Sequence, residues 1–153
     1  MATGKRCVAK GALAGLIGGL AGAGAKLVAE QIYPPRVQGQ IPPSVALAEQ
    51  IAGHPLAHAE KKVALESIHL AFGALAGAVY GAAVEYEPSF GAWKGAAFGI
   101  TLNKITHETL LPKMGLSAPA ERQPARERIS EWVSHAAYGM VTDAVRRMVR
   151  RSL

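Results

Sequence analysis

Long apolar segments alternate with polar connections along the whole chain. Each is long enough, at about 1.5 Å of helical rise per residue, to cross the roughly 30 Å hydrocarbon core of a bilayer. Prolines bound these segments at Pro34-Pro35, Pro88 and Pro112, where a helix cannot continue undisturbed. The pattern predicts an all-α integral membrane bundle of about four transmembrane helices. It forms a single domain over residues 1–153, with spans at about 11–33, 63–84, 90–111 and 128–149.

The first connection contains a shorter helical pattern. Pro42, Pro43 and Ser44 mark a helix start, apolar residues follow as far as Ile51, and Gly53 marks a stop. We expect a short amphipathic helix at the membrane interface.

The last segment is the most polar of the four. An apolar stripe that includes Ile129, Val133 and Met140 is interrupted by polar residues such as Asp143 and Arg146. Such a helix either spans with its polar face inward or lies in the interface. We favour spanning, because the other three helices leave one wall of a bundle missing.

Composition and charge agree with a membrane bundle. Half of the residues are hydrophobic and 18% are charged, against about 25% in an average soluble protein. The net charge of +6 comes largely from basic residues near the two chain ends, a distribution that places both termini in the cytoplasm. Aromatic or recognition elements for nucleic acid do not accompany these basic residues. The single cysteine excludes an internal disulfide.

Glycine recurs every fourth residue in three of the segments, so one face of each helix permits close backbone approach. Such runs weaken a water-soluble helix by about 1 kcal/mol per glycine, and they favour a membrane bundle. We favour packing within one chain over homo-oligomerisation through these faces. The predicted packing residues are Gly15, Gly19, Gly73, Gly77, Gly81, Gly91, Gly95 and Gly99.

Ionisable residues fall toward the same end of all four segments. In an up-down-up-down bundle they form one buried polar layer, and charge at membrane depth usually marks a partnered or functional site. His107 and Glu108 are adjacent, so they point to different faces unless the helix is distorted there. The predicted layer consists of Lys26, Glu30, Glu66, His69, Lys104, His107, Glu108, Glu131 and His135. Its expected functional core is Glu30, His69, His107, Glu131 and His135, with Lys26 as a counter-charge.

Three interpretations of this layer stay open. In the first, each carboxylate pairs with a lysine or histidine and the layer is structural. In the second, the histidines and glutamates form a proton or ion pathway. In the third, the layer binds a metal, as in bundles with inward Glu-x-x-His motifs. The weak metal candidates are Glu66, His69, Glu131 and His135.

The sequence does not predict an enzyme. The serines near the histidines lack a nucleophile elbow, and the glycine-rich stretches lack the lysine-serine ending of a phosphate-binding loop. We expect no catalytic residue and no cofactor.

Residues of the polar layer also carry a family resemblance. The chain resembles the YagU family of bacterial inner-membrane proteins, from about Lys10 to Arg147 and most specifically around Ser130-Glu131 and His135. Its connection after Pro34-Pro35 is shorter than in longer members, and its last helix is less hydrophobic. The resemblance implies a multi-span inner-membrane protein, and it supplies no reaction or ligand. It rests on Lys26, Glu30, Pro34-Pro35-Arg36, His69, Tyr80, Glu85, His107, Pro112, Gly115, Ser130-Glu131, His135 and Arg146-Arg147.

Together these patterns predict a small polytopic protein of the bacterial inner membrane. Its favoured function is that of a non-enzymatic structural or pH-responsive membrane component. The alternatives are a proton or ion conducting membrane protein and a metal-binding helical bundle. The expected partner is the lipid bilayer, with a homo-oligomer or a larger membrane complex left open and no nucleic acid.

Overall fold

The computed structural model describes residues 6–36 and 41–153, which form helices and connections without a strand. The predicted all-α fold is therefore confirmed. The elements are α1 (Val8–Ile32), α2 (Pro43–Ala52), α3 (His58–Tyr86), η1 (Pro88–Gly95), α4 (Ala96–Ile105), η2 (Thr106–Leu110), α5 (Leu111–Lys113), η3 (Ala120–Arg122) and α6 (Ala125–Ser152).

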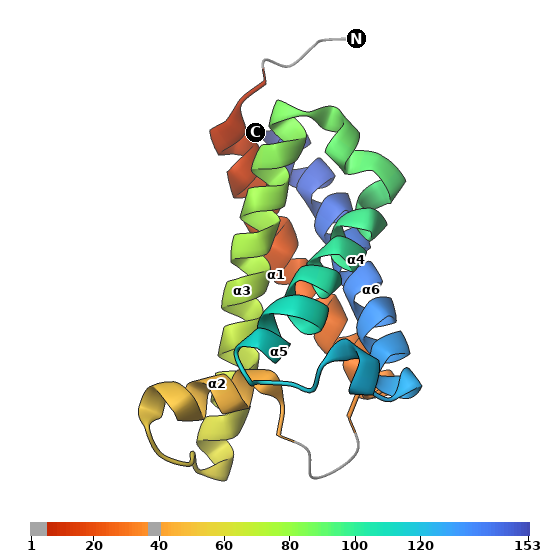
Figure 1. The fold of residues 1–153 in the computed structure, drawn as a ribbon. Coiled ribbons are helices and arrows are strands. Elements are labelled where there is room, and N and C mark those ends of the chain that lie inside the picture. Colours follow the sequence, from red (N-terminus) through yellow and green to blue (C-terminus); the bar gives the residue numbers. More distant parts are fainter. Residues whose placement is uncertain (1–5, 37–40) are drawn as a thin grey trace.

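Four antiparallel arms build the bundle (Figure 1). Three arms are the long helices α1, α3 and α6, and the segment from η1 to α5 is the third arm in chain order. α1 packs along both α3 and α6, and α4 packs against α6. The start of α1 and the end of α6 lie together, where Lys10 Nζ donates a hydrogen bond to the Leu153 carbonyl oxygen at 2.5 Å. We call this the terminal end, and the opposite end, which carries α2 and α5, the distal end.

The third arm differs from the continuous helix expected over about 90–111. It begins with a 3-10 helix, η1, whose last three residues take positive φ values: Trp93 (59°), Lys94 (50°) and Gly95 (81°). An α-helix cannot pass through that left-handed region, which only glycine adopts readily. Further on, η2 is a π-helical turn. Both interruptions change which side chains the arm directs into the bundle.

The short helix expected in the first connection is α2. A proline occupies its first turn, where the missing N–H is no loss, and Gly53 ends it with a φ of 74°. The Glu49 side chain accepts a hydrogen bond from the Leu56 amide at 3.0 Å and lies 3.0 Å from Lys61 Nζ. The Leu56 amide and the Lys61 ammonium hold the pKa of the Glu49 carboxyl below its ordinary value. These contacts join α2 to the start of α3.

Glycines let α1 approach α3 at backbone distance. A methyl group added at Gly77 would collide with the backbone oxygen of Gly15, and one added at Gly15 would collide with that of Gly77. Helices joined in this way pack by van der Waals contact of their backbones. The facing pairs are Gly11–Gly81, Gly15–Gly77 and Gly19–Gly73.

A second set of glycines brings α6 close to its two neighbours. Gly18 and Gly22 of α1 lie against α6 beside Thr142. Gly95 and Gly99 of the third arm lie against the α6 backbone around Gly139. Among the predicted packing glycines, Gly91 differs, because a methyl group there would meet Val84 at an ordinary 3.5 Å.

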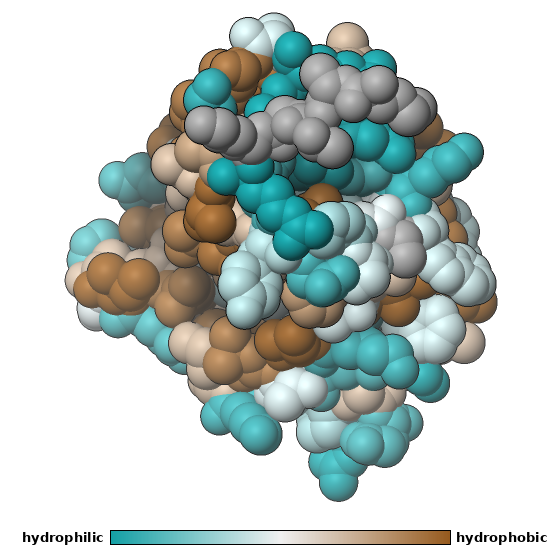
Figure 2. All heavy atoms as spheres, turned by 90° about the horizontal axis from the view of Figure 1, so that it is seen from above, coloured by the Kyte–Doolittle hydropathy of each residue, from teal (hydrophilic) through white to brown (hydrophobic). Residues whose placement is uncertain are grey.

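The bundle buries polar side chains and exposes large apolar ones. Exposed apolar side chains occur on each arm, and Figure 2 shows brown hydrophobic residues over much of the left and lower part of the face seen from above. Soluble proteins rarely bury polar and charged side chains fully. The buried polar and charged residues are Lys26, Asn103, Thr106, Ser130, Glu131, Ser134, His135, Thr142, Asp143 and Arg146.

Two of the described helices, α1 and α3, are long and apolar enough to cross a membrane by length and composition. α6 is not among them, and nine of its residues on one face are buried, from Ser130 to Arg146. Its apolar side chains Ile129, Val133 and Met148 are exposed instead. The polarity of α6 is thus the reverse of that of a surface helix in water.

Gly77→Ala tests the glycine contact between α1 and α3. The added methyl group meets the Gly15 backbone, and overpacking of this kind destabilises by about 1–3 kcal/mol or more. Gly24→Ala is the matched control, because no atom lies within 4 Å of a methyl group placed there. We expect lower thermal stability, followed by circular dichroism in mild detergent, for the Gly77 variant alone. Equal shifts in both variants would contradict the contact.

Candidate functional site

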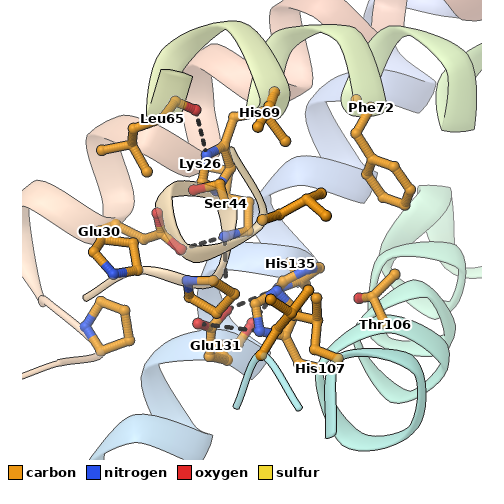
Figure 3. Close-up of a pocket in the computed structure, with 18 of the residues that line it drawn as sticks. Lys26, Glu30, Ser44, Leu65, His69, Phe72, Thr106, His107, Glu131 and His135 are labelled. Carbon is orange, nitrogen blue, oxygen red and sulfur yellow. Dashed lines mark hydrogen bonds and ion pairs between the residues drawn. The ribbon is translucent and has the colours of Figure 1, made fainter. Parts of the chain in front are cut away.

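A pocket of about 430 Å³ lies at the distal end of the bundle, between α3 and the third arm (Figure 3). Its walls are mostly apolar and include Leu65 and Phe72 of α3 and Leu102 of α4. Residues 34–36 and the start of α2 also line it. A volume of this size falls within the range of small-ligand sites, about 300–1,000 Å³.

The Glu131 carboxylate occupies the polar wall of this pocket. Its side chain is 3% exposed. Oε1 lies 3.3 Å from His107 Nδ1, and Oε2 lies 3.5 Å from His135 Nδ1. Arg36 Nη1 approaches Oε1 at 3.4 Å and Lys26 Nζ approaches Oε2 at 3.6 Å. We call Glu131, His107 and His135 the acid–histidine centre.

Each of the two cations beside the centre has a second carboxylate of its own. Lys26 pairs with Glu30 one helical turn later in α1, and Arg36 Nη2 lies 3.3 Å from Glu127 Oε1. Three carboxylates therefore face two cations, which leaves one net negative charge when the histidines are neutral. Within this group, Glu131 Oε2 accepts no hydrogen bond from any described residue.

Backbone contacts decide which nitrogen of two pocket histidines carries the proton. His135 Nδ1 lies 2.7 Å from the Glu131 carbonyl oxygen, and His69 Nδ1 lies 2.8 Å from that of Leu65. A carbonyl oxygen only accepts, so Nδ1 donates in both rings. In the neutral ring the lone pair then resides on Nε2. Such a second contact is typical of histidines whose other nitrogen binds a metal.

The donor atoms of the centre lie close enough to share one cation. One ligand atom each from His107, Glu131 and His135 lies within 4.8 Å of the other two. The His107 and His135 rings meet edge to face, with centroids 4.9 Å apart. Two imidazoles and one carboxylate, with a further position open, form the ligand set of many catalytic zinc and non-haem iron sites.

The structure brings six of the nine predicted layer residues to the pocket. The other three lie elsewhere: Glu66 and Lys104 are exposed, and Glu108 accepts a hydrogen bond from Trp132 Nε1 at 2.8 Å. The Glu66–His69 pair considered for a metal therefore does not form one site. The six that line the pocket are Lys26, Glu30, His69, His107, Glu131 and His135.

Three neighbours of the centre were missed in the sequence. Arg36, named only in the family resemblance, follows Pro34-Pro35 and reaches Glu127 and Glu131. Asn103 is 1% exposed, and its Nδ2 lies 3.3 Å from His135 Nδ1. Glu127 and Asn103 each precede a centre residue by four positions, Glu131 and His107 respectively. That helical spacing was a usable signal.

A second buried ion cluster lies nearer the terminal end. Asp143 is fully buried, and its carboxylate lies 2.7 Å from Arg146 Nη2 and 3.2 Å from Arg147 Nη2. The Arg146 guanidinium also lies 5.7 Å from the centre of the Tyr80 ring. In the sequence Asp143 and Arg146 interrupt an apolar stripe, and Arg146-Arg147 also belong to the family resemblance. The Asp143–Arg146 ion pair compensates the charge that α6 buries, while the Arg147 side chain is 42% exposed.

Glu131→Ala tests whether the carboxylate holds the centre together. Removal of one partner of a buried ion pair leaves uncompensated charge, here on Lys26 and Arg36, and destabilises by about 3–5 kcal/mol. Glu66→Ala, on an exposed face of α3, is the control and should change stability little. The measurement is reversible unfolding in mixed micelles. The same small loss in both variants would show that Glu131 is dispensable.

Comparison with known proteins gives one family. The chain belongs to the family described as "Protein of unknown function (DUF1440)", which matches residues 20–144. This match includes all six residues that the polar layer contributes to the pocket. No curated protein and no solved structure matches the chain. The resemblance to the YagU family stays a prediction.

Proposed function

We propose that this protein is a non-enzymatic, four-span protein of the bacterial cytoplasmic membrane that binds a divalent transition-metal ion at His107, Glu131 and His135. Both termini face the cytoplasm. The metal-binding part rests on one observation, the convergence of three ligand atoms within 4.8 Å around a buried carboxylate.

The reversed polarity of α6 supports its passage through the membrane. Its buried residues include Glu131, Asp143 and Arg146, whereas Val133 and Met148 are 57% and 68% exposed. Apolar surroundings on the outside and polar partners on the inside are what a spanning helix with functional residues requires. Glu131, Asp143 and Arg146 lower the mean hydropathy of α6 although they are buried inside the bundle.

The same argument applies to the third arm. Asn103 and Thr106 are buried, and Ile100 and Ile105 are 38% and 57% exposed. Its interrupted backbone lies against α6, and irregular backbone is tolerated at membrane depth where protein covers it. Exposed Tyr86 and Trp93 at the terminal end suit a membrane–water interface.

Single cysteines in a Cys7→Ser background test the four spans. The proposal predicts that Ser89→Cys and Ser152→Cys react with an impermeant maleimide from the cytoplasmic side of oriented vesicles. Ala52→Cys and Glu121→Cys, at the distal end, should react only from the opposite side. Reaction of the Ser152 and Glu121 variants from the same side would show that α6 does not span the membrane. Reaction of all four from one side would exclude any span.

The charge of the centre favours a cation. Glu131 and its charged neighbours carry one net negative charge beside two neutral imidazoles, and Glu131 Oε2 accepts no hydrogen bond within residues 6–36 and 41–153. Imidazole and carboxylate ligands suit Zn²⁺, Fe²⁺ and related first-row ions. The tautomer of His135, fixed by the Glu131 carbonyl oxygen, keeps its Nε2 available as a ligand.

Cobalt binding to the purified protein tests the metal site. After removal of metals by a chelator, we expect one Co²⁺ per chain, with the visible absorption of a low-coordinate site. His107→Ala and His135→Ala should each weaken binding by more than about 100-fold, since loss of an outer partner alone costs about 10- to 100-fold.

His54→Ala and Glu66→Gln are the controls for the cobalt experiment. Both residues are exposed and lie outside the pocket, so Co²⁺ binding should persist unchanged. Co²⁺ binding that survives loss of either centre histidine would contradict the proposed metal site. The absence of stoichiometric Co²⁺ binding would contradict it as well. Native mass spectrometry of the same samples gives the subunit number.

The glycine faces do not by themselves supply a surface for a homo-oligomer. The glycine row of α1 that begins at Gly11 is occupied by α3, and Gly18 and Gly22 are occupied by α6. An oligomer of this protein therefore requires contacts other than these rows.

A further inference from the structure

We infer that the pocket binds a single-chain amphiphile with a carboxylate head group, whose head lies at the metal and whose chain extends toward the bilayer. The inference rests on the proposed metal site and names the ligand class of the same pocket.

The first argument is the arrangement of the pocket walls. α3 and α4 both pack against other arms but make few backbone contacts with each other. Tyr80 and Phe98 bridge them, with ring centroids 4.2 Å apart. On the distal side of that stack the pocket lies between the two arms, and Phe72 and Leu110, which line it, are 45% and 46% exposed. The exposure of these two side chains points to an opening between the two arms that we propose cross the membrane.

The second argument is the chemistry of the lining. Leucine, isoleucine and phenylalanine side chains predominate on the walls contributed by α3 and the third arm, which also carry His69, Thr106 and His107. The charged side chains come from α1, α6 and Arg36 of the first connection. Figure 3 shows Phe72 directed into the space on the side away from Glu30 and Glu131. An occupant that matches this division has a long apolar part and one compact polar end. A molecule of that kind partitions into a bilayer and reaches the side opening from there.

The third argument is the charge at the polar end. Without a metal the centre and its neighbours carry one net negative charge, and a divalent ion reverses this to one net positive charge. Three protein ligands leave a coordination position for an exogenous group. Lys26 and Arg36, which are already included in this count, lie beside Glu131 at the same end of the pocket. A carboxylate head group brings the single negative charge and the oxygen ligand that this end would accept.

Palmitate labelled with carbon-13 is the probe, with the full-length protein in phosphatidylcholine nanodiscs. In the Co²⁺-loaded protein, the paramagnetic ion should strongly broaden the resonance of the carboxyl carbon and affect that of the terminal methyl carbon much less. The Zn²⁺-loaded protein is the diamagnetic reference. A carboxyl resonance that is the same in the Co²⁺ and Zn²⁺ forms would overturn the inference.

Leu65→Trp and Leu75→Trp separate the pocket from the lipid surface. Leu65 lines the pocket, whereas Leu75, on the same helix, is 65% exposed and does not line it. The Leu65 variant should weaken palmitate binding by at least about tenfold, and the Leu75 variant should not. Equal binding by both variants would show that palmitate partitions into lipid, which overturns the inference. Leu110→Trp, on the third arm, repeats the test from the opposite wall.

Cobalt stoichiometry distinguishes the two possible failures. Co²⁺ binding without a paramagnetic effect on palmitate rejects the amphiphile and leaves the proposed metal site standing. Absence of Co²⁺ binding rejects both. Co²⁺ binding by the Leu65 variant shows that its fold survives, because the substitution leaves His107, Glu131 and His135 unchanged.

Discussion

The close approach of α1 to two other helices is the constraint on which the bundle depends. Glycines on adjacent faces of α1 let the backbones of α3 and α6 come near at the same time. With so little side-chain volume between the helices, the stabilising contacts are those of backbone atoms. Lys26 lies one turn beyond Gly22 on the face that meets α6, and it therefore reaches Glu131. The position of the polar centre follows from the position of the glycines.

The centre itself depends on two local features of the chain. Glu131 and His135 are four residues apart on α6, which places both on the face that meets α1 and α4. The π-helical turn of η2 contains His107 and Glu108. His107 lies against the buried Glu131, while Glu108 accepts a hydrogen bond from the next residue of α6, the exposed Trp132. A local irregularity of this type is frequent at functional sites.

Much of this arrangement could be predicted from the sequence, and the rest has identifiable physical causes. Helical spacing and proline positions gave the helical class and the helix in the first connection. The position of ionisable residues toward the same end of the four segments correctly indicated six residues that line the pocket. The three exceptions are Glu66, Lys104 and Glu108. Their positions depend on how far each helix is rotated, which is set by tertiary packing. The break at Trp93–Gly95 was missed because non-glycine residues adopt positive φ there. The pH response and ion conduction expected from the histidines stay predictions.

The periodic glycine contact between α1 and α3 has a consequence for how the bundle finds its alignment. Because the glycines recur every fourth residue on both helices, sliding one helix by a turn again sets glycine against glycine along most of the interface. Such an interface stabilises the packing of the two helices but does not select a single register. Specific polar partners lie outside this glycine repeat. The Cys7 amide donates a hydrogen bond to Glu85 of α3 at the terminal end, and Lys26 pairs with Glu131 across the neighbouring α1–α6 interface. Buried polar pairs are known to set register in packed helices at some expense of stability. In this bundle, the same carboxylate that forms the centre also specifies which turn of α1 lies beside which turn of α6.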